Sequence, residues 1–297
     1  MTAGPEPSET LLLTGIPRGG TTLVCHLLNL LPDVVALSEP MNVMEFSGLN
    51  QTEVFTLINR FSRENRRTIL EHGTAISKQV NGRLPDNPCL PGLNDLGLRK
   101  SILSLGEIRI GKKLTEDFTL AIKHNAAFTA LIDRLVNGYR CFGIVRNPLA
   151  VLTSWSTVDF AVHSGRTPVG EALDRNLRNE LEAIGDLLDR QLHLLNWFFK
   201  RISETLPRDR IIKYEELISS GGKCLSSITP TALNLNEKLK DQAKFGLLNQ
   251  EKLKMIGQRL LSNEGAYLRF YSRDEIIREL DRITNTSSIT QVYKDED

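Results

Sequence analysis

Eight residues near the start of the chain, Gly15-Ile-Pro-Arg-Gly-Gly-Thr-Thr22, have the composition of a turn that binds an anion. The apolar run Leu11–Leu13 before them predicts a buried strand, and the apolar spacing of Leu23–Leu31 after them predicts a helix. Glycines let the backbone approach a ligand closely, and the amide N–H groups and dipole at a helix N-terminus attract negative charge. The turn therefore predicts a phosphate site. The alternative is a glycine-rich strand–helix turn with no binding role.

The turn lacks the lysine of the common nucleotide-binding loop. In G-x-x-x-x-G-K-[ST] the lysine follows the second glycine, and here Thr21 follows Gly20. The cation lies earlier, at Arg18. This departure argues against an ordinary magnesium-nucleotide hydrolase or kinase.

A second group of residues with phosphate chemistry begins at Arg146. This arginine ends a predicted strand at 140–145, and Ser154 follows eight residues later, about two helical turns on. Both side chains can then face a second phosphate, with the guanidinium supplying charge-assisted hydrogen bonds. The alternative is a surface arginine and an unrelated helix serine.

These two segments resemble the two phosphate-binding motifs of sulfotransferases that use 3′-phosphoadenosine 5′-phosphosulfate (PAPS). PRGGTT is similar to the family's PRSGTT or PKSGTT loop, with Gly19 where the family usually has serine, and Arg146 to Ser154 matches its R-x-P-x-x-x-x-x-S motif. Tyr214, in Lys-Tyr-Glu-Glu-Leu, is similar to a family tyrosine that lies near the adenine; a buried core tyrosine is the alternative. The resemblance implies a PAPS site formed by Pro17, Arg18, Gly19, Gly20, Thr21, Thr22, Arg146, Ser154 and Tyr214.

Two residues are candidates for the general base that would take the proton of an acceptor hydroxyl. Glu39 follows a predicted strand and lies 21 residues after Arg18, as in tyrosylprotein sulfotransferases, which this segment resembles. The alternative for Glu39 is a capping or salt-bridged carboxylate. His124 is the rival, because cytosolic sulfotransferases use a histidine in a K-x-H setting; here Lys123 and His124 are adjacent, so at most one is expected to face the site easily.

The predicted activity is in-line transfer of a sulfuryl group from PAPS to a hydroxyl acceptor, with Arg18 and the loop amides stabilising the leaving phosphate. No metal is expected, because the sulfuryl group carries less charge than a phosphoryl group. The acceptor, a small molecule, sugar or peptide, stays open. A nucleotide kinase-like enzyme and a catalytically silent nucleotide-binding protein are the alternatives. The family's basic C-terminal loop has only the candidates Lys252, Lys254 and Arg259.

Strands and helices alternate along the chain, which predicts an α/β fold with a P-loop-type parallel sheet flanked by helices on both faces. Ligands of such sheets bind at the carboxyl ends of the strands. The polar residues expected at those ends are Arg18, Glu39, Lys123, His124, Arg146 and Tyr214. The predicted strands are 11–13, 34–37, 118–122, 140–145 and 210–213, and the predicted helices are 50–70, 126–136, one after Pro148, and 171–206 with a break near Gly185. We also expect a long loop at 81–97 that borders the acceptor pocket and a small hairpin at 107–114.

The composition limits the classes of partner and compartment. The 297 residues are expected to form a single sulfotransferase domain, with a disordered lead-in at 1–9, a helical C-terminal region at 221–297 packed on the core and a frayed end at 294–297. Lys and Arg number 37 against 36 Asp and Glu, so no nucleic-acid partner is expected. No signal peptide and no membrane-spanning run of about 20 apolar residues is visible. Four well-separated cysteines indicate free thiols and a cytoplasmic protein.

Overall fold

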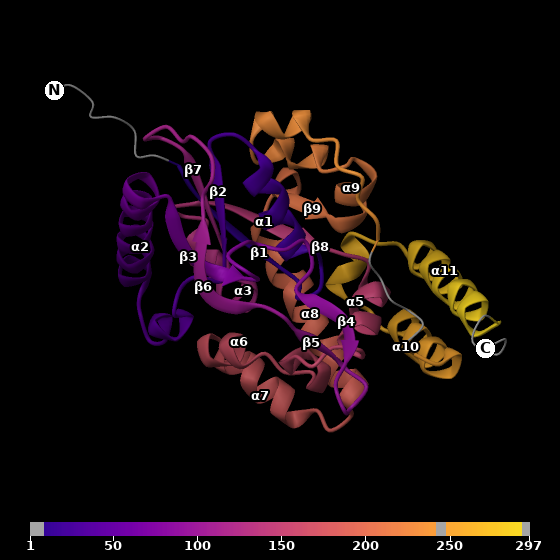
Figure 1. Cartoon of the computed structure of the whole chain (residues 1–297). Coiled ribbons are helices and arrows are strands. Elements are labelled where there is room, and N and C mark those ends of the chain that lie inside the picture. The colour runs from indigo at the N-terminus through magenta and orange to yellow at the C-terminus, as the bar shows by residue number, and fades with distance from the viewer. Residues whose placement is uncertain (1–8, 242–247, 293–297) are drawn as a thin grey trace.

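A parallel five-stranded sheet forms the centre of the computed structural model (Figure 1), which describes residues 9–241 and 248–292. Its strands are mostly apolar runs that are buried on both faces, which is typical of a sheet covered on two sides by helices. In the order in which they lie side by side, the strands are β2 (Val34–Ser38), β7 (Thr119–Lys123), β1 (Thr10–Gly15), β8 (Arg140–Val145) and β9 (Ile211–Lys213). The predicted α/β fold with a parallel sheet is confirmed.

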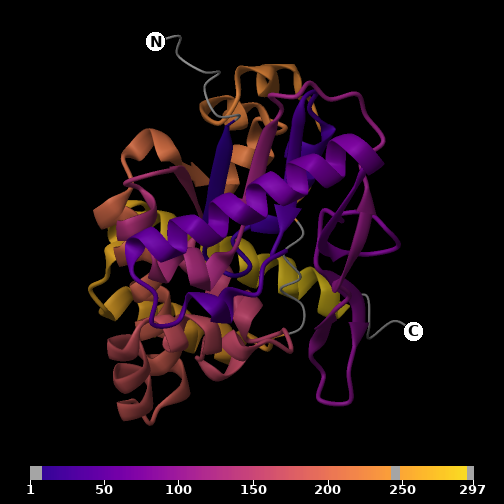
Figure 2. The same ribbon diagram turned by 90° about the vertical axis from the view of Figure 1, so that its left-hand side faces the viewer.

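Helices cover both faces of the sheet (Figures 1 and 2). Alternation along β1 sends Leu11 and Leu13 to one face and Leu12 to the other. The face of Leu11 and Leu13 packs against α1 and the turns η4 and η5, and the other face packs against α2, α3, α5, α8 and the C-terminal helices. The helices are α1 (Thr21–Leu30), α2 (Gln51–His72), α3 (Asn125–Ala130), α4 (Ile132–Leu135), α5 (Pro148–Trp155), α6 (Pro168–Leu173), α7 (Arg175–Ala183), α8 (Leu187–Thr205), α9 (Tyr214–Ser219), α10 (Gln250–Ser262) and α11 (Arg273–Val292).

Short 3₁₀ turns connect these elements. They are η1 (Val43–Phe46), η2 (Ala161–Ser164), η3 (Arg208–Arg210), η4 (Lys223–Ser227), η5 (Pro230–Asn234) and η7 (Ala266–Arg269). Within the described residues, no helix combines the length and apolar character needed to cross a bilayer. All four cysteines are free thiols, as expected.

Local signals set the ends of the helices that were foreseen. Asn50 and Glu53 form a capping box at the start of α2, and Gly73 ends that helix with a φ of 66°. The break predicted near Gly185 separates α7 from α8, and a second break at Asp174 separates α6 from α7. The helix predicted at 126–136 is divided into α3 and α4 at Leu131.

Two antiparallel pairs between α2 and β7 were not foreseen. β3 (Thr74–Gln79) pairs with β6 (Ser104–Arg109), so the hairpin predicted within 107–114 is wrong. β4 (Cys89–Leu93) pairs with β5 (Arg99–Ser101), so the loop predicted at 81–97 contains a strand. Pro91 and Gly92 suggested a turn, but they lie where the β4–β5 register is irregular, and a bulge tolerates both residue types.

The two ends of the chain that were predicted to be disordered or frayed lie largely outside the residues that the structure describes. Residues 1–8 and 293–297 are not among the described residues. Glu9, the last residue of the predicted lead-in, is part of the fold, because its carboxylate pairs with Arg140 and its carbonyl accepts from Arg66.

Candidate functional site

The carboxyl ends of the five parallel strands carry the polar residues in one row. Across the sheet, the residues at or directly after these ends are Glu39 (β2), Lys123 and His124 (β7), the turn 15–20 (β1), Arg146 (β8) and Tyr214 (β9). Neighbouring strands are about 4.8 Å apart, so the turn lies about two strand spacings from Glu39 and one from Arg146. The sequence prediction that these residues meet at one edge is confirmed by the strand order.

The turn after β1 presents an uncapped helix N-terminus. Among the described residues no side chain caps α1, whose first turn contains no acidic residue. The carbonyls of Ile16, Pro17 and Arg18 accept hydrogen bonds from Gly19 N (2.8 Å), Trp155 Nε1 (2.8 Å) and Arg146 Nη1 (3.3 Å). These carbonyls are therefore engaged with protein donors, and the amides of the first helical turn are left to attract an anion.

Two glycines of the turn are required by close packing. Gly20 has a φ of 95°, and a Cβ there would lie 2.5 Å from Cδ2 of Tyr214. A Cβ at Gly19 would lie 2.8 Å from the carbonyl oxygen of Ile16. The serine that the resembled family has at this position would therefore need a shift of the backbone in this chain.

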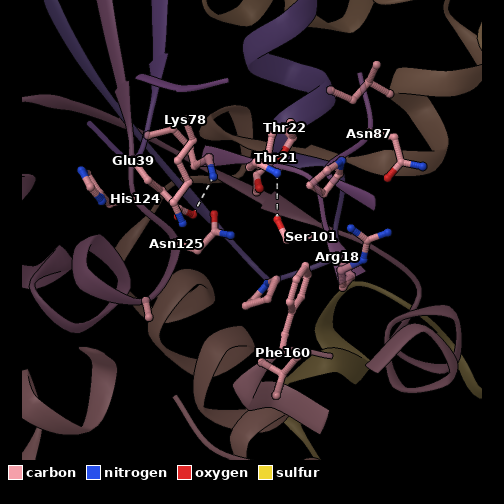
Figure 3. A pocket seen from close by; sticks show the side chains of 18 of the residues that line it. Arg18, Thr21, Thr22, Glu39, Lys78, Asn87, Ser101, His124, Asn125 and Phe160 are labelled. Carbon is pink, nitrogen blue, oxygen red and sulfur yellow. Dashed lines mark hydrogen bonds and ion pairs between the residues drawn. The ribbon is translucent and has the colours of Figure 1, made fainter. Parts of the chain in front are cut away.

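A cavity of about 680 Å³ opens along this row of strand ends (Figure 3). Apart from the row itself, its walls include the β3 lysine, the segments that flank the β4–β5 hairpin, the η1 and η2 turns, the starts of α1, α3 and α6, and the segment 238–240. Gly19 and Ser154 are not among the lining residues. The other predicted site residues border the cavity: Pro17, Arg18, Gly20, Thr21, Thr22, Glu39, His124, Arg146 and Tyr214.

Glu39 lies beside Lys78 at one end of the cavity (Figure 3), and it also pairs with Lys123. Its Oε1 lies 2.8 Å from Nζ of Lys123, whose side chain is 2% exposed, and its Oε2 pairs with Nζ of Lys78. Burial favours the neutral acid, but the two ammonium groups outweigh it and hold the pKa of Glu39 well below its usual range. Glu39 is therefore a carboxylate that stays ionised in the resting protein.

His124 also borders the cavity, but its acceptor nitrogen is in use. Nε2 accepts the backbone N–H of Met41 at 3.2 Å, and the ring lies edge-on to Phe128 with centroids 5.0 Å apart. Burial lowers the pKa of His124 to about 3, so the ring is neutral near pH 7. Both Lys123 and His124 line the cavity, contrary to the expectation that only one would.

The side chain of Arg18 reaches toward the second motif. Its Nε donates to Oγ of Ser154 at 3.2 Å, and its guanidinium lies 5.9 Å from the ring centroid of Phe160. Burial, with the nearby guanidinium groups of Arg99 and Arg146, lowers the pKa of Arg18 to about 10, at which it is still a cation near neutral pH. The structure thus joins the first and second motifs through Arg18 and Ser154.

Arg146 contacts both an aromatic ring and a carboxylate. Its side chain is 8% exposed and stacks on the Tyr214 ring, with Cζ 4.1 Å from the centroid. Its Nη2 lies 2.7 Å from Oδ1 of Asp241, which also accepts from the Tyr214 hydroxyl at 3.2 Å. A carboxylate of the chain itself therefore contacts two of the groups assigned to the donor.

Sequence reasoning missed several cations near the site. Lys78 comes from β3, a strand that was not foreseen. Arg99 comes from β5 and donates to Thr157 Oγ1 at 2.7 Å, and its buried Nε has no hydrogen-bond partner among the described residues. Lys238 and Lys240 line the cavity, whereas the C-terminal candidates considered from the sequence, Lys252, Lys254 and Arg259, do not. The sequence signals that could have pointed to these cations are the turn-forming residues before β5 and the two lysines at alternate positions, 238 and 240.

Comparison with known proteins gives limited information. No protein-family model matches the chain, and no curated protein matches it in sequence. Among solved structures, the sulfotransferase domain from the Synechococcus PCC 7002 olefin synthase matches with a TM-score of 0.37 and 14% identity, covering 94% of this chain and 95% of that one. A likeness at this level leaves the function to be argued from the site itself.

Proposed function

We propose that the protein is a sulfotransferase that moves a sulfuryl group from PAPS to a hydroxyl acceptor. The observation that carries the proposal is the row of strand ends, which places one carboxylate, the uncapped N-terminus of α1 and the Arg146 guanidinium along a single cavity. We take the helix N-terminus and the guanidinium as two separate anion sites. PAPS has phosphate groups at two ends of one nucleoside, so it needs two such sites.

The turn and Arg146 would hold the two ends of the donor. The amides of Gly20, Thr21 and Thr22 at the start of α1 would bind the 5′-phosphosulfate. Arg146 would bind the 3′-phosphate with charge-assisted hydrogen bonds, and Ser154 would support it from beside Arg18. Tyr214, packed against Gly20, would lie beside the nucleoside.

In the transfer step, a bond forms between the acceptor oxygen and sulfur while the bond between sulfur and the 5′-phosphate oxygen breaks. The acceptor proton passes to Glu39, and adenosine 3′,5′-bisphosphate leaves. Lys123 and Lys78 keep Glu39 ionised, so that it can accept the proton. Their positive charge also stabilises the negative charge of the reacting group. The low pKa makes Glu39 a weak base, so proton transfer would occur late, when the acceptor oxygen is already bonded to sulfur.

The geometry favours Glu39 over His124 as the base. His124 Nε2, the nitrogen that would take the proton, already accepts a hydrogen bond from the Met41 amide. The acceptor itself would lie against the apolar wall that includes Val43, Phe160 and Val169. Its class, a small molecule, sugar or peptide with a hydroxyl, is part of the proposal.

The donor site is tested by calorimetric titration with adenosine 3′,5′-bisphosphate, adenosine 5′-monophosphate and ATP, each with and without Mg²⁺. We expect the bisphosphate to bind best and without dependence on Mg²⁺. Arg146→Ala should weaken its binding by about 1.5–3 kcal/mol, the usual worth of a hydrogen bond to a charged group. Arg60→Ala, an exposed arginine of α2, is the matched control.

Three results would contradict the proposal in different ways. Equal affinity for the monophosphate and the bisphosphate would remove the role of Arg146 and Ser154. Preference for ATP with Mg²⁺ would favour the kinase-like alternative. Tight bisphosphate binding without sulfuryl transfer to any hydroxyl acceptor tried would favour the silent nucleotide-binding protein.

A further inference from the structure

The second anion site is occupied by a carboxylate of the chain. Asp241 Oδ1 lies 2.7 Å from Arg146 Nη2 and accepts from the Tyr214 hydroxyl at 3.2 Å, while its Oδ2 accepts from Arg282 Nη2 on α11 at 2.8 Å. The Asp241 side chain is 27% exposed, in contrast to the 8% of Arg146. One carboxylate thus gathers donors from β8, α9 and α11 at the place assigned to a phosphate.

A carboxylate and a phosphate use the same donors. Both bind a guanidinium through two oxygens in one plane, and both accept hydroxyl hydrogen bonds. Two anions on the same face of a largely buried guanidinium would also repel each other. Asp241 and a phosphate group are therefore competitors for Arg146 and Tyr214.

We propose that Asp241 stands in for the donor's 3′-phosphate in the free protein and must leave Arg146 when a nucleotide 3′-phosphate binds. The inference rests on the proposed function, because it identifies the competing ligand as that phosphate. Asp241 then acts as a gate that sets the affinity for the donor.

The surrounding contacts allow Asp241 to leave without loss of the helix that anchors it. Arg282 also pairs with Glu279, one helical turn away on α11, with distances of 2.7 and 2.8 Å. Arg282 can therefore keep a carboxylate partner when Asp241 moves, and it can hold Oδ2 of Asp241 while Oδ1 leaves Arg146.

The segment that ends at Asp241 borders the cavity, so a movement of this segment would change its contacts with a bound donor. Lys238, Leu239 and Lys240 line the cavity directly before Asp241, and the backbone N–H of Glu237 donates to the carbonyl of Gly221 at 3.0 Å. A displacement that begins after this anchor would carry Lys238 and Lys240 with it. The exchange replaces one negative charge at Arg146 by a phosphate dianion, and two lysines on the moving segment are placed to neutralise it.

A gate and a purely structural ion pair predict opposite effects of removing Asp241 on bisphosphate affinity. If Asp241 competes with the ligand, its removal raises the fraction of protein that can bind, and apparent affinity rises with that fraction. If Asp241 instead positions Arg146 for the ligand, its removal weakens binding.

The test is calorimetric titration of the wild type and Asp241→Asn with adenosine 3′,5′-bisphosphate and with adenosine 5′-monophosphate, which lacks the 3′-phosphate. We expect Asp241→Asn to bind the bisphosphate about 1.5- to 5-fold more tightly, in the range of an exposed ion pair, and the monophosphate with unchanged affinity. Glu264→Gln is the matched control: it removes a carboxylate that pairs with Arg273 and contacts neither Arg146 nor Arg282 in the described contacts, and its bisphosphate affinity should equal that of the wild type. Asp241→Ser serves as a second variant, and circular dichroism verifies that each variant is folded.

The outcomes separate the gate from the function on which it rests. Equal or weaker bisphosphate binding by both Asp241 variants, with the wild type still binding, would overturn the gate and leave the donor site intact. An equal gain for the monophosphate would overturn the assignment to the 3′-phosphate. Failure of the wild type and both variants to bind the bisphosphate would overturn the proposed function, and the gate with it.

Discussion

At the scale of single residues, the site depends on the Glu39 carboxylate, which pairs with two lysines. Glu39 has a φ of 48°, and its backbone N–H donates to the carbonyl of Lys123 at 2.7 Å, so both its backbone and its side chain bind to the end of β7. A left-handed backbone is uncommon for a residue other than glycine and often marks a functional position. This strained conformation directs the carboxylate between Lys78 and Lys123.

Replacing Glu39 by glutamine keeps its size and removes its basicity. We expect turnover to fall by about 10²- to 10⁴-fold while bisphosphate affinity stays near that of the wild type, because a positioned general base contributes about this much. His124→Gln is the comparison and should cost less. Steady-state rates with a hydroxyl acceptor decide the matter; near-full activity of Glu39→Gln beside an inactive His124→Gln would reverse the assignment.

Removing Lys78 tests the origin of the low Glu39 pKa. Loss of one ammonium group stabilises the protonated acid relative to the carboxylate, so Lys78→Met should move the acidic limb of the turnover profile to higher pH. The profile of the wild type is measured beside it, with Lys113→Met as a lysine control that does not border the cavity. An acidic limb that stays in place would show that Glu39 does not control it.

The titration of His124 should instead change how the stability of the folded protein depends on pH. Its pKa is about 3 in the folded protein and about 6.5 when unfolded, so the unfolded chain binds more protons between these values. Stability from the neutral ring is complete above pH 6.5 and is lost as pH falls toward 3, even though the neighbouring Glu39 carboxylate partly favours the charged ring.

His124→Gln keeps an acceptor for the Met41 amide but cannot titrate. We expect the rise in free energy of unfolding between pH 4.5 and 6 to flatten by about 1.3 kcal/mol per pH unit, close to the slope of one proton. Urea unfolding at several pH values measures it. The exposed His72 provides the control, because His72→Gln should keep the wild-type slope.

At the scale of elements, the two ends of the β4–β5 hairpin form one wall of the cavity. Asp86, Asn87 and Pro88 line it before β4, and Ser101 and Leu103 line it at and after the end of β5. Arg99 joins this hairpin to the segment after α5, because its N–H donates to the Thr157 carbonyl and its carbonyl accepts from Asp159, both at 2.9 Å. The hairpin is thus tied to the same region as Ser154.

We expect this hairpin to order further when a donor product and an acceptor are bound together. Hydrogen exchange of amides in 86–103 should slow by about tenfold or more, because local openings are suppressed by a ligand that contacts only the closed form. Amides in the middle of α2, which does not border the cavity, are the internal control. Unchanged exchange in 86–103 with both ligands bound would contradict a role for the hairpin as a cover.

At the scale of the whole molecule, two apolar cores lie on opposite faces of one sheet. Leu27 of α1 is fully buried in one of them, while Trp155 and Trp197 are buried in the other. If the chain is one domain, as we propose, the two cores share the sheet and unfold together.

Leu27→Ala should therefore shift a signal that arises on the far face. We expect it to lower the free energy of unfolding by about 2–5 kcal/mol and to move the tryptophan-fluorescence and circular-dichroism midpoints in urea together. Leu30→Ala on the same helix is the matched control, because Leu30 is 49% exposed. Separate midpoints for the two signals would indicate more than one folding unit.

The sequence alone determined the parts that depend on local spacing. The apolar runs that form β1, β2, β7 and β8, the glycines of the turn and the position of Arg146 after a strand are all local signals, and parallel strands bring their carboxyl ends to one edge. The fold class and the row of polar residues at the strand ends follow from these signals.

Only the tertiary structure decided which groups the site residues contact. The partners of Glu39 are Lys78 and Lys123, that of Arg18 is Ser154 and one partner of Arg146 is Asp241, all separated by many positions along the chain. The pairing of β3 with β6 has the same character. Such contacts depend on how strands and helices pack, and neither local periodicity nor turn composition records them, so the sequence could name Glu39 and Arg146 as candidates but not the charges that surround them.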